Sequence, residues 1–213
     1  MQLTRGFGAR RLLSPLGLVD GCLEAHKTVK KLSHSRLFIA IVPPDSIQDA
    51  LAELEVGLPG AHWTPPPQIH LTLRFLGDVA PRTTSDIRNA LESLRIPTFH
   101  LEVCAVGHFP PRGRPRVLWA GVSASAALAH LQQRVDKAMV RIGLPPEPRK
   151  WQPHLTLAKL QGAPEIKVAE FLATNALLRL QPFAVTQFHL FSSVTSPEGA
   201  DYTLEESFDL VEN

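Results

Sequence analysis

Two copies of a His-Leu-Thr-Leu tetrad are the part of this 213-residue sequence with the clearest capacity for chemistry. The first copy begins at His70 and the second at His154, 84 residues later. The seven-residue segments that begin with these histidines match at five positions, and a proline-containing turn precedes each one. Self-similarity over such a distance indicates two copies of one supersecondary unit.

The spacing within each tetrad places its two polar side chains together. In a β-strand successive side chains alternate between faces, so histidine and threonine share one face while the leucines point into the core. His70 then lies beside Thr72, and His154 beside Thr156. If a pseudo-two-fold axis relates the copies, two imidazoles and two hydroxyls surround a common point.

Two imidazoles around one ligand suit the hydrolysis of a phosphodiester. One histidine can activate water and the other can protonate the departing oxygen, because a pKa of about 6.5 allows both protonation states near neutral pH. Thr72 and Thr156 can donate hydrogen bonds to the non-bridging phosphate oxygens. Neither tetrad contains a carboxylate or cysteine as a third metal ligand, so we expect no metal and no cofactor.

Hydrophobic periodicity predicts strands and helices that alternate along the chain. Strands are expected at residues 37–42, 69–76, 99–109, 117–122, 151–160, 184–191 and 202–210. Helices are expected at residues 45–54, 81–94, 125–142 and 165–172. The first part of this order reads as a β-α-β-α unit, and the pattern begins again at the second tetrad.

Composition restricts the class of protein. The chain is 44% hydrophobic and 20% charged, as in ordinary globular proteins, and no apolar run is long enough to cross a membrane. Two cysteines favour a reducing, cytoplasmic setting. Residues 1–34 are rich in glycine and arginine, and we interpret them as a disordered N-terminal extension or a misassigned start. Residues 35–213 are expected to form a single domain, monomeric and without an obligate protein partner.

Beyond the tetrads, several segments resemble the two-histidine phosphoesterase superfamily, and within it the RNA 2′,3′-cyclic phosphodiesterases, also called 2′-5′ RNA ligases. The resemblance covers about residues 36–210 and includes Arg36-Leu-Phe-Ile-Ala40, His70-Leu-Thr-Leu-Arg-Phe-Leu-Gly77, Val117-Leu-Trp-Ala-Gly121, Pro153-His-Leu-Thr-Leu157 and Tyr202. It implies a bilobal α+β fold, in which two pseudo-symmetric antiparallel sheets flank a central cleft and the helices lie outside.

The resemblance also implies a reaction and a substrate. The substrate is RNA or a nucleotide with a 2′,3′-cyclic phosphate, and the product is a 2′-phosphate. His70 is the acid on the O3′ leaving group and His154 is the base on water, although a symmetric site also permits the reverse order. The reverse reaction would be 2′-5′ RNA ligation.

Four further residues match positions of this family near the substrate. Arg149 and Lys159 are expected to bind phosphate, with lysine standing where the family usually has arginine, which loses the bidentate geometry of a guanidinium. Phe38 matches a position where an aromatic ring can stack on a base, and Tyr202 matches one that lines the cleft. Arg74 is expected to be a charge at the edge or rim.

Three other functions stay open at this point. The same site could act on ADP-ribose 1″,2″-cyclic phosphate or on 2′-5′-linked oligonucleotides, because recognition of the rest of the substrate depends on loops. The chain could also be a non-catalytic module that binds RNA ends. Two intact tetrads argue against such a module, because a binder has no need of two acid-base groups.

Overall fold

A computed structural model describes residues 35–196 and 199–212. The described residues belong to one compact unit. Its strands are β1 (Ser35–Ile41), β2 (Ala61–Trp63), β3 (Leu71–Val79), β4 (Phe99–Leu101), β5 (Val103–Phe109), β6 (Val117–Val122), β7 (His154–Leu160), β8 (Phe183–Val185), β9 (Gln187–Ser196) and β10 (Gly199–Asp209). Its α-helices are α1 (Asp45–Ala52), α2 (Pro81–Glu92), α3 (Ala126–Arg141) and α4 (Glu165–Thr174). The extension predicted for residues 1–34 lies outside the described residues.

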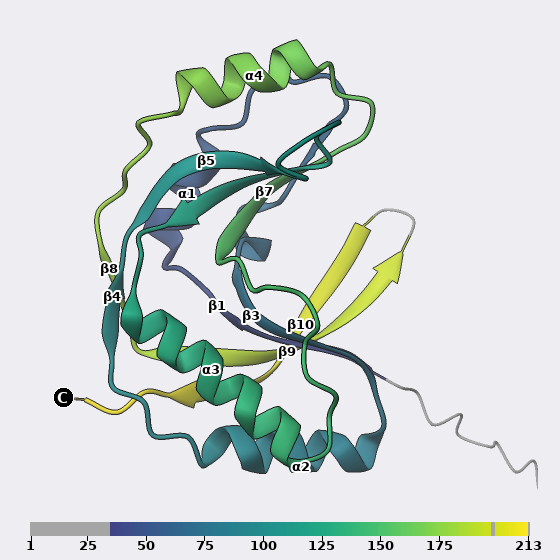
Figure 1. The fold of residues 1–213 in the computed structure, drawn as a ribbon, viewed down its shortest axis with the longest axis vertical. Coiled ribbons are helices and arrows are strands. Elements are labelled where there is room, and N and C mark those ends of the chain that lie inside the picture. Colours follow the sequence, from purple (N-terminus) through teal and green to yellow (C-terminus); the bar gives the residue numbers. More distant parts are fainter. Residues whose placement is uncertain (1–34, 197–198, 213) are drawn as a thin grey trace, which may run out of the picture. The chain divides into compact units, whose positions relative to one another are not determined.

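The strands form one long antiparallel sheet and one small one. The long sheet has the order β10-β9-β1-β3-β7-β6-β5, with β2 also beside β7, and β4 pairs with β8. Its two halves meet where β3 lies next to β7 (Figure 1). The predicted α+β fold of antiparallel strands and helices is confirmed.

The repeat seen in the sequence is a repeat of structure. Apart from the short strand β2 before β3, the order β1-α1-β3-α2 returns as β6-α3-β7-α4. In each unit the strand before the first helix pairs with the strand after it. Helix α3 leaves its own half of the sheet and packs against β3 and α2 of the other half, as Figure 1 shows. The two halves are therefore interlocked by a helix as well as joined through the sheet.

Local sequence explains where the longest helix begins and which face it buries. The Ser125 hydroxyl accepts a hydrogen bond of 3.1 Å from the backbone N–H of Leu128, which caps the first turn of α3. Leu128, Leu131 and Val135 recur at helical spacing and are buried. Within the described residues, no helix is long and apolar enough to span a membrane.

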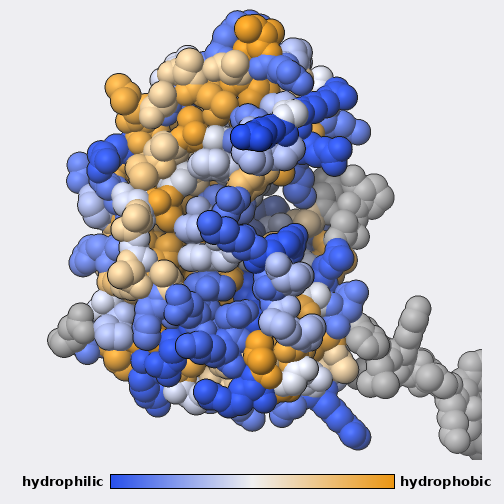
Figure 2. Space-filling view, in the orientation of Figure 1, coloured by the Kyte–Doolittle hydropathy of each residue, from blue (hydrophilic) through white to orange (hydrophobic). Residues whose placement is uncertain are grey.

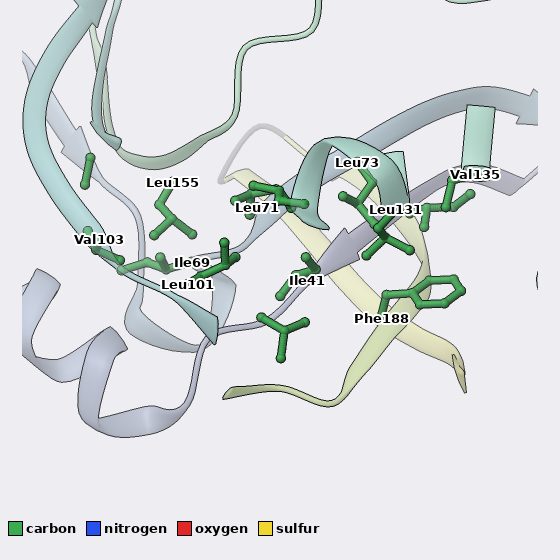
Figure 3. Packing of buried hydrophobic residues seen from close by; sticks show 14 of the residues in the cluster. Ile41, Ile69, Leu71, Leu73, Leu101, Val103, Leu131, Val135, Leu155 and Phe188 are labelled. Carbon is green, nitrogen blue, oxygen red and sulfur yellow. The ribbon is translucent and has the colours of Figure 1, made fainter. Parts of the chain in front are cut away.

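A continuous hydrophobic core lies on the face of the sheet opposite to the two tetrad histidines. Leu71 and Leu155, the second residues of the tetrads, are 2% and 1% exposed. Figure 3 shows both of them in this core, beside Ile69. On the face shown in Figure 2, hydrophobic residues gather where α4 lies, and hydrophilic residues cover most of the region of α2 and α3.

Both tetrad strands contain a β-bulge at the same position of the repeat. In β3, Thr72 and Arg74 pair with the adjacent residues Ala40 and Ile39 of β1, so Leu73 is the additional residue. In β7, Leu157 is additional in the same way, because Thr156 and Ala158 pair with adjacent residues of β6. A bulge interrupts the alternation of faces. The fourth and fifth residues after each histidine are therefore on the opposite faces from those that simple alternation predicts.

The bulge in β3 explains why the prediction for Arg74 was wrong. This arginine is not a rim charge but is only 4% exposed, because the bulge turns it toward the core. Its guanidinium pairs with the Asp136 carboxylate on α3 and donates hydrogen bonds to the backbone carbonyls of Asp136 and Pro145. Arg74 therefore fixes α3 and the following loop against β3.

Candidate active site

The eight residues that the sequence singled out all line one cleft, which has a volume of about 990 Å³. They come from both halves of the sheet and from the loop before β7. They are Phe38, His70, Thr72, Arg149, His154, Thr156, Lys159 and Tyr202. The fold thus brings together residues that are as far as 164 positions apart in the sequence (38 and 202).

A single backbone pair sets the relation between the two tetrads. Leu71 of β3 pairs with Leu155 of β7, and the strands are antiparallel. This register places His70 across from Thr156, and Thr72 across from His154. Each imidazole therefore has a threonine of its own strand and a threonine of the other strand as neighbours on the cleft face.

Equivalent hydrogen bonds orient the two imidazoles. His70 Nδ1 donates to the Gln68 carbonyl, and His154 Nδ1 donates to the Gln152 carbonyl, each over 2.7 Å. A carbonyl only accepts, so the proton of each neutral ring is on Nδ1 and Nε2 carries the lone pair. Both reactive nitrogens are therefore of one kind, Nε2, as a symmetric acid-base pair requires.

Aromatic rings support both imidazoles from the side. The His70 ring lies 4.9 Å from the ring of Phe38 and 5.2 Å from that of Tyr202, which meets it edge-on. The His154 ring meets Phe109 edge-on at 4.9 Å. These contacts restrict the rotation of each imidazole about its hydrogen bond.

Burial changes the pKa of His70 and of the neighbouring Tyr202. Burial lowers the pKa of His70 from its usual 6.5, and the nearby His154 lowers it further, while the hydrogen bond to Gln68 partly offsets both effects. Burial also raises the pKa of the Tyr202 phenol above 10.0, so this group stays protonated and can donate a hydrogen bond. The surroundings of His70 therefore favour its neutral form.

The Phe38 ring is buried and is therefore not exposed for stacking on a base. Its side chain is 3% exposed, and Phe191 stacks on it at a ring distance of 5.2 Å. It touches the cleft beside His70 and Tyr202, which makes it a rigid support for the His70 ring.

Lys159 and Arg149 bring positive charge to the cleft in different settings. The bulge at Leu157 turns Lys159 to the face of His154, and His62 of β2 lies across from it in register. Both line the cleft. Arg149 is exposed, and its Nε donates to the Glu147 carboxylate over 2.8 Å. This ion pair neutralises part of the charge that Arg149 presents.

Sequence reasoning missed two features of the site. Phe75 is 57% exposed and lines the cleft, whereas its place in an apolar strand gave no reason to expect this. The glutamines two residues before each histidine were also missed, although Gln68 and Gln152 are visible as an extension of the repeat to Gln-x-His-Leu-Thr-Leu. Over residues 35–196 and 199–212, no three or more His, Cys, Asp or Glu side chains are grouped to hold a metal ion.

Comparison with known proteins agrees with this geometry. Residues 43–196 match the family model of the 2′-5′ RNA ligase superfamily. The chain is similar to the RNA 2′,3′-cyclic phosphodiesterase of Aeropyrum pernix, with 31% identity over 62% of this chain and 77% of that protein. It is also similar to the RNA 2′,3′-cyclic phosphodiesterase of Thermus thermophilus, with 32% identity over 82% of this chain and 90% of that protein.

A solved structure supports the same assignment. The fold superimposes on E. coli LigT in complex with 3′-AMP with a TM-score of 0.68 and 25% identity, over 84% of this chain and 99% of that one. The paired tetrads, the sheet order and the family match together define a phosphoesterase with two histidines in one cleft. The chain belongs to the 2′-5′ RNA ligase superfamily.

Proposed function

We propose that this protein hydrolyses RNA 2′,3′-cyclic phosphate ends to 2′-phosphates by general acid-base catalysis with His70 and His154. The observation that carries the proposal is the Leu71–Leu155 pair, since it brings two equivalent imidazoles and two threonines to one cleft. The names of the relatives from Aeropyrum pernix and Thermus thermophilus support the substrate class.

The reaction requires one proton to be taken and one to be given. His154 Nε2 accepts a proton from water, whose oxygen attacks phosphorus opposite the P–O3′ bond. That bond breaks, and His70, protonated at Nε2, donates its proton to O3′, which leaves a 3′-hydroxyl and a 2′-phosphate. The histidines end with exchanged protonation states, and proton exchange with solvent restores them.

Phosphate binding prepares His70 for its role as the acid. The lowered pKa of His70 arises mainly from burial, and a bound phosphate anion next to the ring favours the protonated form. The hydroxyls of Thr72 and Thr156 donate to the non-bridging oxygens, and Lys159 adds positive charge at one end of the cleft. Each of these groups acts without a metal ion.

The same ring opening with a different nucleophile would join RNA. If the 5′-hydroxyl of a second RNA takes the place of water, its attack on the cyclic phosphate forms a 2′-5′ linkage and releases the same 3′-hydroxyl. We include this ligation in the proposal because nothing in the acid-base pair distinguishes water from another hydroxyl.

The test is the opening of a 2′,3′-cyclic phosphate by protein treated with EDTA. An RNA oligonucleotide that ends in the cyclic phosphate should yield a 2′-phosphate at an unchanged rate. Loss of activity that a divalent metal restores would contradict the mechanism. A higher kcat/KM on ADP-ribose 1″,2″-cyclic phosphate or on 2′-5′-linked oligonucleotides would assign that compound as the substrate instead. A cyclic phosphate end that binds but stays intact would indicate a binding module.

A further inference from the structure

The two copies of the repeat differ in chemistry at one equivalent position on the cleft face. Five residues after each tetrad histidine stands Phe75 in β3 and Lys159 in β7. Both line the cleft. Because β3 and β7 run in opposite directions from the Leu71–Leu155 pair, these two side chains lie toward opposite ends of it, roughly 10 Å from the pair. At this repeat position the cleft is therefore aromatic toward one end and cationic toward the other, and we name the two ends after it. Arg36 and Arg149 also line the cleft on the Phe75 side.

The aromatic end offers an open surface with a rigid support. Phe75 is 57% exposed, and its ring lies 6.1 Å from that of the buried Phe38. Its other surface faces the cleft and the neighbouring hollow formed by the proline-containing loop 144–148. An exposed aromatic ring of this kind is a typical stacking partner of a nucleobase, and Arg149 at the same cleft wall supplies a planar guanidinium.

The cationic end carries a lysine whose charge is available to a ligand. Lys159 is exposed, and in the described part of the chain its ammonium forms no ion pair. His62 is its partner across β2 and β7, so both side chains reach the cleft from neighbouring strands. Trp63, the aromatic residue of this end, packs on Phe171 at 5.8 Å and is less available for stacking.

We propose that Phe75 and Lys159 fix the direction in which the RNA end lies, with the terminal base on Phe75 and the next phosphodiester on Lys159. This inference rests on the proposed function. In a ribonucleoside 2′,3′-cyclic phosphate the base is attached at C1′, beside C2′, and the chain continues from C4′, beside C3′. Base and 5′-phosphate therefore project to opposite sides of the cyclic phosphate, as the two ends of the cleft require.

The proposed direction accounts for which oxygen leaves. His70 is displaced from the Leu71–Leu155 pair toward the Lys159 end, and His154 toward the Phe75 end. O3′ lies on the side of the 5′-phosphate, so it faces His70, the proposed acid. Water in line with the P–O3′ bond then approaches from the side of His154, and the product is a 2′-phosphate. The opposite orientation would yield a 3′-phosphate.

Three substrates measure the contributions of the Phe75 end and the Lys159 end separately. They are adenosine 2′,3′-cyclic phosphate, the same compound with a 5′-phosphate, and methyl riboside 2,3-cyclic phosphate, which has no base. The ratio of kcat/KM with and without the base measures stacking, and the ratio with and without the 5′-phosphate measures the cationic end. Phe75→Leu should lower the first ratio about tenfold and Phe75→Tyr should retain it. Lys159→Gln should lower the second ratio about fivefold at low salt, Lys159→Arg should retain it, and Lys167→Gln on α4 is the matched control.

The outcomes test the orientation of the RNA end separately from the proposed hydrolase function. Independent loss of one ratio in each variant, with a 2′-phosphate product, supports the orientation. A base preference that survives Phe75→Leu, a 5′-phosphate effect that survives Lys159→Gln, or a 3′-phosphate product overturns it while the hydrolase stands. A wild-type protein that opens none of the three substrates overturns the proposed function and this orientation with it.

Discussion

Leu71 and Leu155 pair across β3 and β7, and this pair lies at the centre of the two-fold relation between the tetrads. Neither leucine touches the cleft, because both are buried in the core on the other face of the sheet. Their pairing nevertheless decides that His70 faces Thr156 rather than another residue, since a slip of one residue would turn the tetrad side chains over. The position of the tetrad histidines and threonines is thus a consequence of core packing.

His70 should titrate below its usual range in the free protein. Burial and the like charge of His154 both lower its pKa from 6.5, so replacing His154 with glutamine should raise it. Tyr202→Ser, which removes a ring 5.2 Å from His70 and admits water, should raise it further. NMR titration of the imidazole resonances measures these shifts. A His70 pKa at or above 6.5 in the wild type would contradict the account.

The lowered pKa also predicts how stability depends on pH. Because the folded state binds this proton less readily than the unfolded state, neutral His70 contributes stability above pH 6.5. That contribution should be lost as the pH falls from 6.5 through the lower folded pKa. Urea unfolding at a series of pH values should therefore show a smaller acid-side loss of unfolding free energy in His70→Gln than in wild type.

Arg74 should matter far more for stability than an ordinary surface arginine. Arg74→Met would leave the partly buried Asp136 carboxylate and the Pro145 carbonyl without their donor, at a cost of about 2–4 kcal/mol in unfolding free energy. Lys167→Met, which breaks an exposed ion pair of 2.7 Å with Glu170 on α4, is the control and should cost less than about 1 kcal/mol. Equal effects in urea unfolding would be inconsistent with the buried network.

Gly107 should be intolerant of a side chain because of the ring beside it. A Cβ at this position would overlap the Trp119 indole, which packs against Phe109 at 5.5 Å, and Phe109 in turn supports His154. We expect Gly107→Ala to cost about 1–3 kcal/mol and to lower kcat. Gly57→Ala, where a Cβ meets nothing within 4 Å, is the control. An unchanged kcat in Gly107→Ala would show that the position of the Trp119 ring does not affect His154.

Alternation within the tetrads was sufficient to predict which side chains share the cleft face, because His70, Thr72 and their counterparts precede the bulges. It failed immediately after them. Arg74 enters the core and Phe75 leaves it, since each bulge adds one residue that a period of two does not include. The bulge forms because of pairing with β1, which is a tertiary relation without a local signal in β3.

Element prediction followed the same division between local and tertiary causes. The helix expected at residues 125–142 is α3, Ala126–Arg141, because its cap and its apolar spacing are local. The strand expected at residues 99–109 is two strands, since β4 pairs with β8 and β5 with β6. The three-residue strand β2 was missed, because so short a segment is a strand only through its pairing with β7.

The most direct test of the acid-base pair is a comparison of wild type, His70→Ala, His154→Ala and the double variant on one RNA 2′,3′-cyclic phosphate. If the imidazoles act in one step, each single variant should lose about 10²–10⁴-fold in kcat. The double variant should lose little more than the worse single variant, because groups that act as a unit are not additive. Unfolding curves verify that all four proteins are folded. A single variant that keeps at least a tenth of wild-type kcat would contradict the paired mechanism.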